Sequence, residues 1–157
     1  MGLAETAAPI TQGVVRRIRQ HPDTAVSRPR GGIHEVFAPA NEPYPLITWT
    51  LVADPVVKDH GTDADEGTRE IRALVDIEVW SRSSVEAKTL DGLLATWFNE
   101  RAAPDLDALV DEQHVYHLER IGRSGGSGPA TDDEGRKYYR EGGAYAIWTT
   151  TPIAKPA

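Results

Sequence analysis

Two carboxylates and a pair of histidines are the side chains of this sequence best suited to acid–base chemistry. Asp76 and Glu78 fall on one face of a predicted strand, and His114 and His117 stand three residues apart on another. Positions an odd number apart on a regular strand point to opposite faces, so the two histidines are not expected to share a metal ion. A hydrolase or ligand-binding enzyme would use Asp76, Glu78 or His117, but no nucleophile–base pair accompanies them. The alternating pattern instead predicts solvated charges or contacts with a neighbouring subunit.

The glycine-rich segment 122–135 resembles a phosphate-binding loop in composition alone. Its sequence, GRSGGSGPATDDEG, lacks the glycine and lysine spacing of nucleotide-binding loops, and no complete nucleophile elbow surrounds Ser124. The sequence contains no cysteine, which excludes disulfides, thiolate metal ligands and cysteine nucleophiles. The five histidines do not have the spacing of a zinc site, which needs three or four converging ligands. We therefore predict a protein without catalytic residues, metal or cofactor.

Composition and charge limit the classes of protein to which this sequence can belong. A chain of 157 residues with 39% hydrophobic and 26% charged residues fits one globular domain with a real core. No apolar run approaches the length of a membrane span, and the first residues do not have the pattern of a secretory signal, so we expect synthesis in the cytoplasm without membrane contact. The net charge of −7 argues against nucleic-acid binding as the main task.

Hydrophobic periodicity predicts the order of the elements. Ile10, Val14 and Ile18 form one stripe on a helix from about Pro9 to Gln20. A strict alternation of apolar residues around position 75 indicates a strand with one buried face. A second amphipathic helix follows, with Ser83 and Glu86 as a capping box, and Ala103-Pro104 ends it. Further segments are assigned as a short strand (33–37), strands (46–52, 114–121 and 143–150) and a possible helical turn (105–113).

Together these segments predict an α+β fold in one domain covering residues 1–157. We expect a mainly antiparallel four-stranded sheet with a long hairpin, packed against two main helices, because a hairpin joins the two middle strands. Residues 54–69 and 122–141 are polar and rich in glycine, and they are interpreted as flexible loops, with short tails at both ends of the chain.

Charged and aromatic residues outside the predicted core are candidates for an interface. Segments of opposite charge can pair head to tail between identical subunits, or can simply be two solvated surfaces. Tyrosine and arginine are favoured anchors of protein interfaces. The candidates are Arg16, Arg17, Arg19, Arg28 and Arg30 in the basic segment; Asp59, Asp63, Asp65 and Glu66 in the acidic hairpin; and Asp76, Glu78, Tyr138, Tyr139 and Arg140.

The order of these segments resembles the tail terminator and tail-completion proteins of long-tailed bacteriophages. The resemblance runs from about Ile10 to Thr150 and rests on a leading helix, APANEPYPLITWTLV, REIRALVDIEVWSRSSVEAKTLDGLL and a late strand near YYREGGAYAIW. Its most specific features are the Pro-Tyr-Pro before a strand and the Val-Trp-Ser that ends the next strand. No fixed catalytic residues contribute to it.

The resemblance implies a structural subunit of the virion rather than an enzyme. Such proteins form a ring, usually a hexamer, at the head-proximal end of the tail tube, where they stop tube growth. The implied partners are other copies of the chain, the major tail tube protein and the head–tail connector or stopper protein, while DNA passes through the lumen without specific binding. A head-completion or stopper ring of the neck is the alternative.

Overall fold

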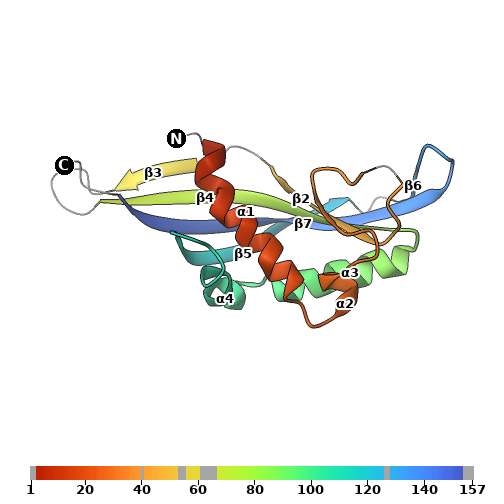
Figure 1. Cartoon of the computed structure of the whole chain (residues 1–157), viewed down its shortest axis with the longest axis horizontal. Coiled ribbons are helices and arrows are strands. Elements are labelled where there is room, and N and C mark those ends of the chain that lie inside the picture. The colour runs from red at the N-terminus through yellow and green to blue at the C-terminus, as the bar shows by residue number, and fades with distance from the viewer. Residues whose placement is uncertain (1–2, 40, 53–55, 61–66, 126–127, 154–157) are drawn as a thin grey trace.

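A mixed sheet with one long central pair of strands organises this protein (Figure 1). The computed structural model describes residues 3–39, 41–52, 56–60, 67–125 and 128–153. The strand order is β1-β2-β4-β7-β5, with β3 beside β4 and β6 beside β7. The strands are β1 (Ile33–Glu35), β2 (Leu46–Leu51), β3 (Val56–His60), β4 (Gly67–Ser81), β5 (His114–Gly125), β6 (Ala130–Thr131) and β7 (Lys137–Ile153).

The antiparallel pair β4–β7 forms the longest strand pairing of the sheet. Its register runs without a break from Gly67 opposite Ile153 to Ser81 opposite Tyr139. The predicted alternation along β4 is confirmed, because its odd-numbered apolar residues are buried in the core. These residues are Ile71, Ala73, Val75, Ile77 and Val79.

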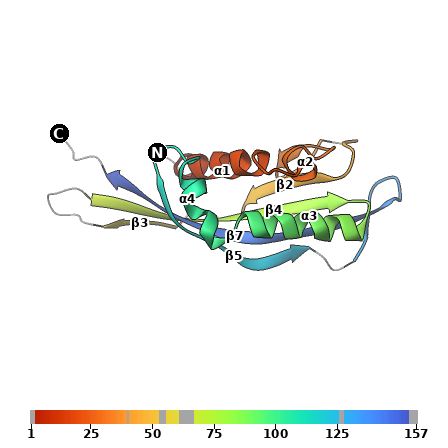
Figure 2. The ribbon, with the colours of Figure 1, turned by 90° about the horizontal axis from the view of Figure 1, so that it is seen from below.

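All helices of the described chain pack on one face of this sheet (Figure 2). They are α1 (Leu3–Arg19), α2 (Thr24–Ser27), α3 (Ser84–Trp97), the 3-10 turn η1 (Glu100–Ala102) and α4 (Ala103–Asp107). The stripe of Ile10, Val14 and Ile18 on α1 is fully buried, as predicted. From α3, Leu90, Leu94 and the following Phe98 enter the same core. The opposite side of the sheet carries no helix, and we call it the open face.

Two helix boundaries differ from those predicted. Helix α1 begins at Leu3, so Pro9 lies inside the helix and not at its first turn. Ala103-Pro104 does not end a helix but begins α4, where a proline in the first turn loses no hydrogen bond. In both cases, tolerance of proline near a helix start made the boundary ambiguous.

The predicted capping box at the start of α3 is half confirmed. Ser83 is the N-cap, and its hydroxyl accepts a hydrogen bond from the Glu86 backbone N–H at 3.2 Å. The Glu86 carboxylate does not return to Ser83 but accepts a hydrogen bond from the Ser81 hydroxyl at 2.5 Å. That hydroxyl accepts in turn from the Ser83 N–H at 3.0 Å. Ser81 is therefore a third residue of this cap, and its hydrogen bonds join the end of β4 to the start of α3.

The observed sheet differs from the predicted one, which had four antiparallel strands and two long loops. The sheet has seven strands, and the short strand β1 runs parallel to β2. Strand β3 occupies part of the supposed loop 54–69, and β5, β6 and β7 occupy much of the supposed loop 122–141. The polar, glycine-rich segments form strands here because each pairs its backbone with one of the two long strands, β4 or β7.

The outer strand β5 contains two β-bulges, which correct the expected placement of the histidines. The register shifts between Val115 and His117 and again between Arg120 and Gly122. The extra residue, Tyr116, brings both His114 and His117 opposite residues that share one side of β7, Thr150 and Trp148. The prediction that they face opposite sides was therefore wrong.

One end of the sheet extends beyond the helices (Figures 1 and 2). It consists of β3, the first residues of β4 and the last residues of β7, and we call these residues (56–60, 67–70 and 150–153) the arm. The described part of the core ends at Ile71 and Thr149, so no helix covers the arm. Its described side chains instead form ion pairs such as Arg69–Asp59 at 2.8 Å.

Two glycines offer a matched test of this packing. A Cβ at Gly142 would lie 2.4 Å from the Ile77 carbonyl oxygen, whereas a Cβ at Gly92 on α3 meets nothing within 4 Å. We expect Gly142→Ala to destabilise the fold by about 1–3 kcal/mol through overpacking. Gly92→Ala should stabilise it by up to about 1 kcal/mol because alanine favours the helix.

Urea unfolding of the two variants and the parent protein measures both effects. Equal losses of stability in the two variants would contradict the strand register at Gly142 and the exposure of Gly92.

Candidate functional site

The structure brings two separate groups of candidate interface residues together on the open face. Glu78 lies on β4 next to Arg140 of β7, and their side chains form an ion pair at 3.2 Å. The Arg140 guanidinium lies 5.4 Å from the ring of Trp80, and Tyr138 stacks on the same ring at 5.4 Å. We call Asp76, Glu78, Trp80, Tyr138 and Arg140 the open-face patch.

Partial burial makes the two carboxylates of this patch costly to ionise. Desolvation raises the pKa of Asp76, and the positive charge of Arg140 opposes this effect. Desolvation likewise raises the pKa of Glu78, with Arg140 lowering it and the neighbouring Asp76 raising it further. The two acids point to the same face from alternate positions of one strand, so the charge of Asp76 disfavours that of Glu78.

An aromatic row extends the patch toward the turn between β6 and β7. Tyr44 stacks on Tyr138 at 6.2 Å, and the Arg82 guanidinium lies 4.3 Å from the Tyr44 ring. Arg82 also forms an ion pair with Asp132 at 2.7 Å. Burial raises the pKa of Tyr44, an effect that Arg82 opposes. Stacked aromatic and arginine side chains of this kind are the residue types that interfaces favour.

His117, the third residue that a hydrolase or ligand-binding enzyme would use, lies apart from Asp76 and Glu78. His117 faces Trp148, whereas Asp76 lies opposite Ala144, four residues farther along β7. That offset corresponds to about 13 Å along the strands. His117 instead contacts Glu119 at 3.2 Å. Within the described residues, no group of three or more histidine, aspartate or glutamate side chains could hold a metal ion.

Arg17 belongs to the interior rather than to a surface. Its side chain is 8% exposed, stacks on Trp97 at 3.7 Å and forms an ion pair with Asp105 at 3.3 Å. It donates to the Trp97 carbonyl oxygen at 3.0 Å, and the Trp97 indole donates to the Arg17 carbonyl oxygen at 2.7 Å. These reciprocal bonds join α1 to α3. Burial lowers the pKa of Arg17, although Asp105 opposes that shift.

Arg16 and Arg19 line a groove of about 500 Å³ between α1 and the edge of the sheet. Arg16 donates to the Leu109 carbonyl oxygen at 2.8 Å and pairs with Asp111 at 3.4 Å. Arg19 is exposed and makes no hydrogen bond or ion pair with another described residue. The groove is lined by Ala8, Thr11, Gln12, Val15, Arg16, Arg19, Glu35, Trp49 and Leu51.

The other candidate interface residues are distributed over the surface. Arg28 and Arg30 are exposed after α2, and Tyr139 is half-buried opposite Ser81. Asp59 lies on the arm, where both of its carboxylate oxygens accept hydrogen bonds from Arg69. Asp63, Asp65 and Glu66 lie outside the described residues.

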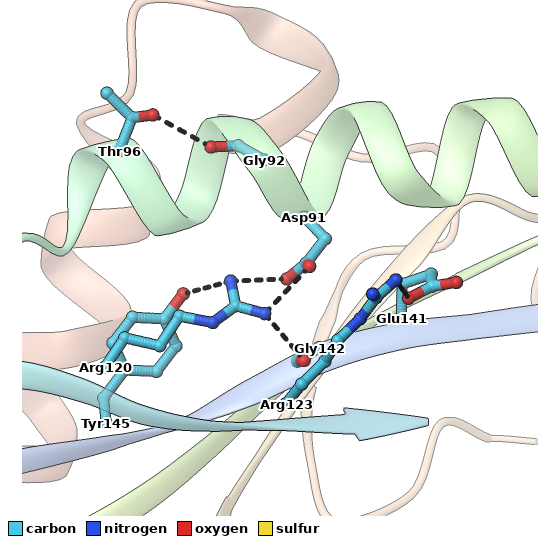
Figure 3. A network of polar contacts seen from close by, with 8 residues as sticks. All are labelled: Asp91, Gly92, Thr96, Arg120, Arg123, Glu141, Gly142 and Tyr145. Carbon is cyan, nitrogen blue, oxygen red and sulfur yellow. Dashed lines mark hydrogen bonds and ion pairs between the residues drawn. The ribbon is translucent and has the colours of Figure 1, made fainter. Parts of the chain in front are cut away.

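A buried polar network holds α3 on the sheet (Figure 3). Arg120 forms two hydrogen bonds with Asp91 at 3.0 and 3.1 Å and donates to the Gly142 carbonyl oxygen at 2.8 Å. It also lies 3.3 Å from the hydroxyl of Tyr145, whose pKa burial raises to about 12. Beside it, Arg123 pairs at 2.8 Å with Glu141, which is 4% exposed.

Sequence reasoning missed the roles of these buried charges, although the signal was present. Arg17 falls three residues after Val14, on the apolar stripe of α1. Asp91 similarly lies between Leu90 and Leu94 on the apolar face of α3. A charge at a core position needs a partner, because an unpaired buried charge is unstable. Helical position alone could thus have marked both residues as structural, while the partners required the fold.

The fold matches a solved structure at low sequence identity. A chain of the "Virion of native gene transfer agent (GTA) particle" superimposes with a TM-score of 0.55 and 9% identity. The match covers 87% of this chain and 91% of that chain. No family model and no curated protein matches the sequence. None of the described helices has the length and apolar composition that crossing a membrane requires.

The raised pKa of Asp76 predicts a pH-dependent stability. A raised pKa means that the folded state binds more protons than the unfolded state between the two pKa values. Stability therefore falls as the pH rises from about 4 through the folded-state pKa and then levels off. Asp76→Asn should remove this contribution, and its melting temperature should exceed that of the parent more at pH 7 than at pH 3.5. A larger advantage at pH 3.5 would contradict this environment for Asp76.

Removing Asp91 should destabilise the fold because Arg120 then remains buried without its main partner. We expect Asp91→Ala to cost about 2–3 kcal/mol. Asp111→Ala is the matched control, since Asp111 and its partner Arg16 are 65% and 45% exposed. It should cost less than about 1 kcal/mol. Denaturant unfolding measures both, and equal losses would show that the network adds nothing beyond a surface ion pair.

Proposed function

We propose that this chain is a structural subunit of a phage-like particle. Several copies, with six as the expected number, form a ring at the head-proximal end of the tail tube. The ring ends polymerisation of the tube and joins the tail to the head connector. Its partners are other copies of the chain, the major tail tube protein and the connector or stopper protein, and DNA passes through its lumen.

The fold likeness to a chain of the gene transfer agent virion is the observation that carries this proposal. The likeness extends over nearly the whole of both chains, 87% and 91%, so it concerns one complete domain and not a shared motif. A common fold is by itself compatible with different functions. Among the functions that this fold allows, the resemblance of the sequence to tail terminators favours a ring at the end of the tail tube.

The surface composition supports an assembly role. The open-face patch carries two carboxylates whose charge the fold disfavours, together with stacked aromatic and arginine side chains. Such groups reduce the stability of an isolated subunit and are retained where they serve contacts. The net charge of −7 also suits a channel through which DNA moves without adhering.

The proposal predicts a closed oligomer of defined stoichiometry. Native mass spectrometry of the concentrated protein should give six subunits, and negative-stain images should show rings with a central hole. Antibody labelling of purified particles should place the protein where the tail meets the head. Labelling within the head-side connector would favour a stopper ring instead.

Two results would oppose this function. The first is a protein that stays monomeric at high concentration and is absent from purified particles. The second is an enzymatic turnover that Asp76→Asn or His117→Ala abolishes without changing assembly, because that outcome would favour the hydrolase alternative.

A further inference from the structure

The centre of the open face holds a half-buried carboxylate that no described residue neutralises. Asp76 lies opposite Thr50 of β2 and Ala144 of β7, so the three side chains share this face. Asp76 makes no hydrogen bond or ion pair with another described residue, since Arg140, which attracts it, pairs with Glu78 instead. Burial raises the pKa of Asp76. A cation from another chain would form a stronger ion pair at this partly desolvated site than in water.

Small and apolar side chains surround this carboxylate. Ala144 and Ala146 of β7 carry only a methyl group, and Leu74, opposite Ala146, is only half-buried. Val52 is 49% exposed and donates its N–H to the Leu74 carbonyl oxygen at 2.9 Å. The described helices all lie on the other side of the sheet, so the backbone of a partner element can approach closely here. We define the central strip as Thr50, Leu74, Asp76, Ala144 and Ala146.

Bulky aromatic side chains stand at both ends of the central strip. Trp148 lies opposite Arg72, whose guanidinium is 4.1 Å from its ring, and Trp80 lies opposite Arg140 at the other end. The distance from Arg72 to Trp80 along β4 is about 26 Å. A helix of 17 residues, the length of α1, measures about 25 Å. A helix of this length therefore fits along the strands between the two tryptophans.

The outer side of α1 carries the cation that the central strip lacks in its own chain. We define the α1 ridge as Gln12, Val15, Arg16 and Arg19, which recur at intervals of three and four residues and line the groove beside α1. Arg19 is exposed and makes no hydrogen bond or ion pair with another described residue, whereas Arg16 already pairs with Asp111. The ridge of a second copy thus offers an arginine together with the apolar side chain of Val15.

Other exposed cations are less suited to the central strip. Arg101 lies in the 3-10 turn η1 and Arg28 follows the four-residue helix α2, so neither stands on a helix that could lie along the sheet. Lys88 stands on the exposed side of α3, one turn from Val85, which is 74% exposed. Lysine, however, is depleted at protein interfaces, whereas arginine is enriched. Charge complementarity and residue type together favour α1.

We propose that the α1 ridge of one copy packs along the central strip of the next copy, with Arg19 paired to Asp76. This inference rests on the proposed ring and specifies the surfaces from which it is built. The ridge and the strip lie on opposite sides of the sheet, and a contact between different surfaces of identical copies is the kind that closes a ring. Each subunit contributes one ridge and one strip, so every contact of the ring is the same.

Charge reversal tests the ion pair between copies. Arg19→Glu and Asp76→Lys should each weaken self-association about tenfold, because like charges then meet in the contact. Lys88→Glu, at an exposed site on α3, is the matched control and should have little effect. Sedimentation velocity measures the association, and circular dichroism checks that each variant is folded.

Mixing the two reversed variants separates a contact between copies from an effect on folding. In a ring with an even number of subunits, the two variants can alternate, so that opposite charges meet at every contact. An equimolar mixture of Arg19→Glu with Asp76→Lys should therefore associate about as strongly as the parent protein, although neither variant does so alone. A mixture that stays as weak as its folded components would overturn the contact.

Cross-linking tests the contact without changing a charge, and the sequence contains no cysteine of its own. Val15→Cys introduces a thiol on the α1 ridge, and Ala144→Cys introduces one opposite Asp76. With a short bismaleimide, the concentrated double variant should give a ladder of cross-linked species up to the full ring, whereas a mixture of the single variants should stop at dimers. Thr89→Cys combined with Ala144→Cys places the helical thiol on α3 and should give no specific ladder.

The outcomes separate this contact from the ring itself. Rings that form without the cross-link would overturn the contact while leaving the proposed function intact. A monomer without a cross-link would count against both. A ladder from Thr89→Cys, or a loss of association from Lys88→Glu that equals that of Arg19→Glu, would assign the open face to α3 and would also overturn the contact.

Discussion

The unbroken pairing of β4 with β7 is the constraint on which the rest of this molecule depends. Both strands are longer than the helices that cover them, so part of the ribbon has a core and part has none. The covered part holds the helices through Ile77, Val79 and their neighbours. The uncovered part is stabilised by its hydrogen-bond ladder and by ion pairs such as Arg69–Asp59. A single secondary-structure element thus provides both a folded body and a projecting extension.

Buried charges fix the positions of the helices on this ribbon. Arg17 reaches α3 through Trp97, and Arg120 reaches it from β5 through Asp91. Both arginines satisfy backbone carbonyl oxygens as well as carboxylates. Apolar packing tolerates small sliding movements, whereas hydrogen bonds of defined direction do not. The helices are therefore held in one register on the sheet.

Sequence periodicity predicted the parts of the fold that follow regular repeats. The alternation along β4 and the stripe of α1 and α3 were sufficient to assign three major elements. Periodicity failed at the first part of β7, which was assigned to the loop 122–141, so that the predicted strand began only at Gly143. Gly142 and Gly143 are required in this strand because the Ile77 carbonyl oxygen and the Arg120 side chain approach too closely for a Cβ. Such a requirement arises from tertiary contacts and leaves no local pattern.

The open-face patch was foreseen in part. Asp76, Glu78, Tyr138 and Arg140 were chosen separately, and strand register alone joins them into one patch. The groove could not be foreseen, since it depends on where the short strand β1 stops.

The bulges at Tyr116 and Ile121 have a consequence for how copies of this chain can coexist at high density. A straight outer strand of this length would template the addition of further strands and lead to fibrils. Each bulge interrupts the hydrogen-bonding repeat and twists the strand locally, so a second molecule finds no continuous ladder there. The bulges thereby protect the molecule from open-ended addition of strands along the outer edge of β5.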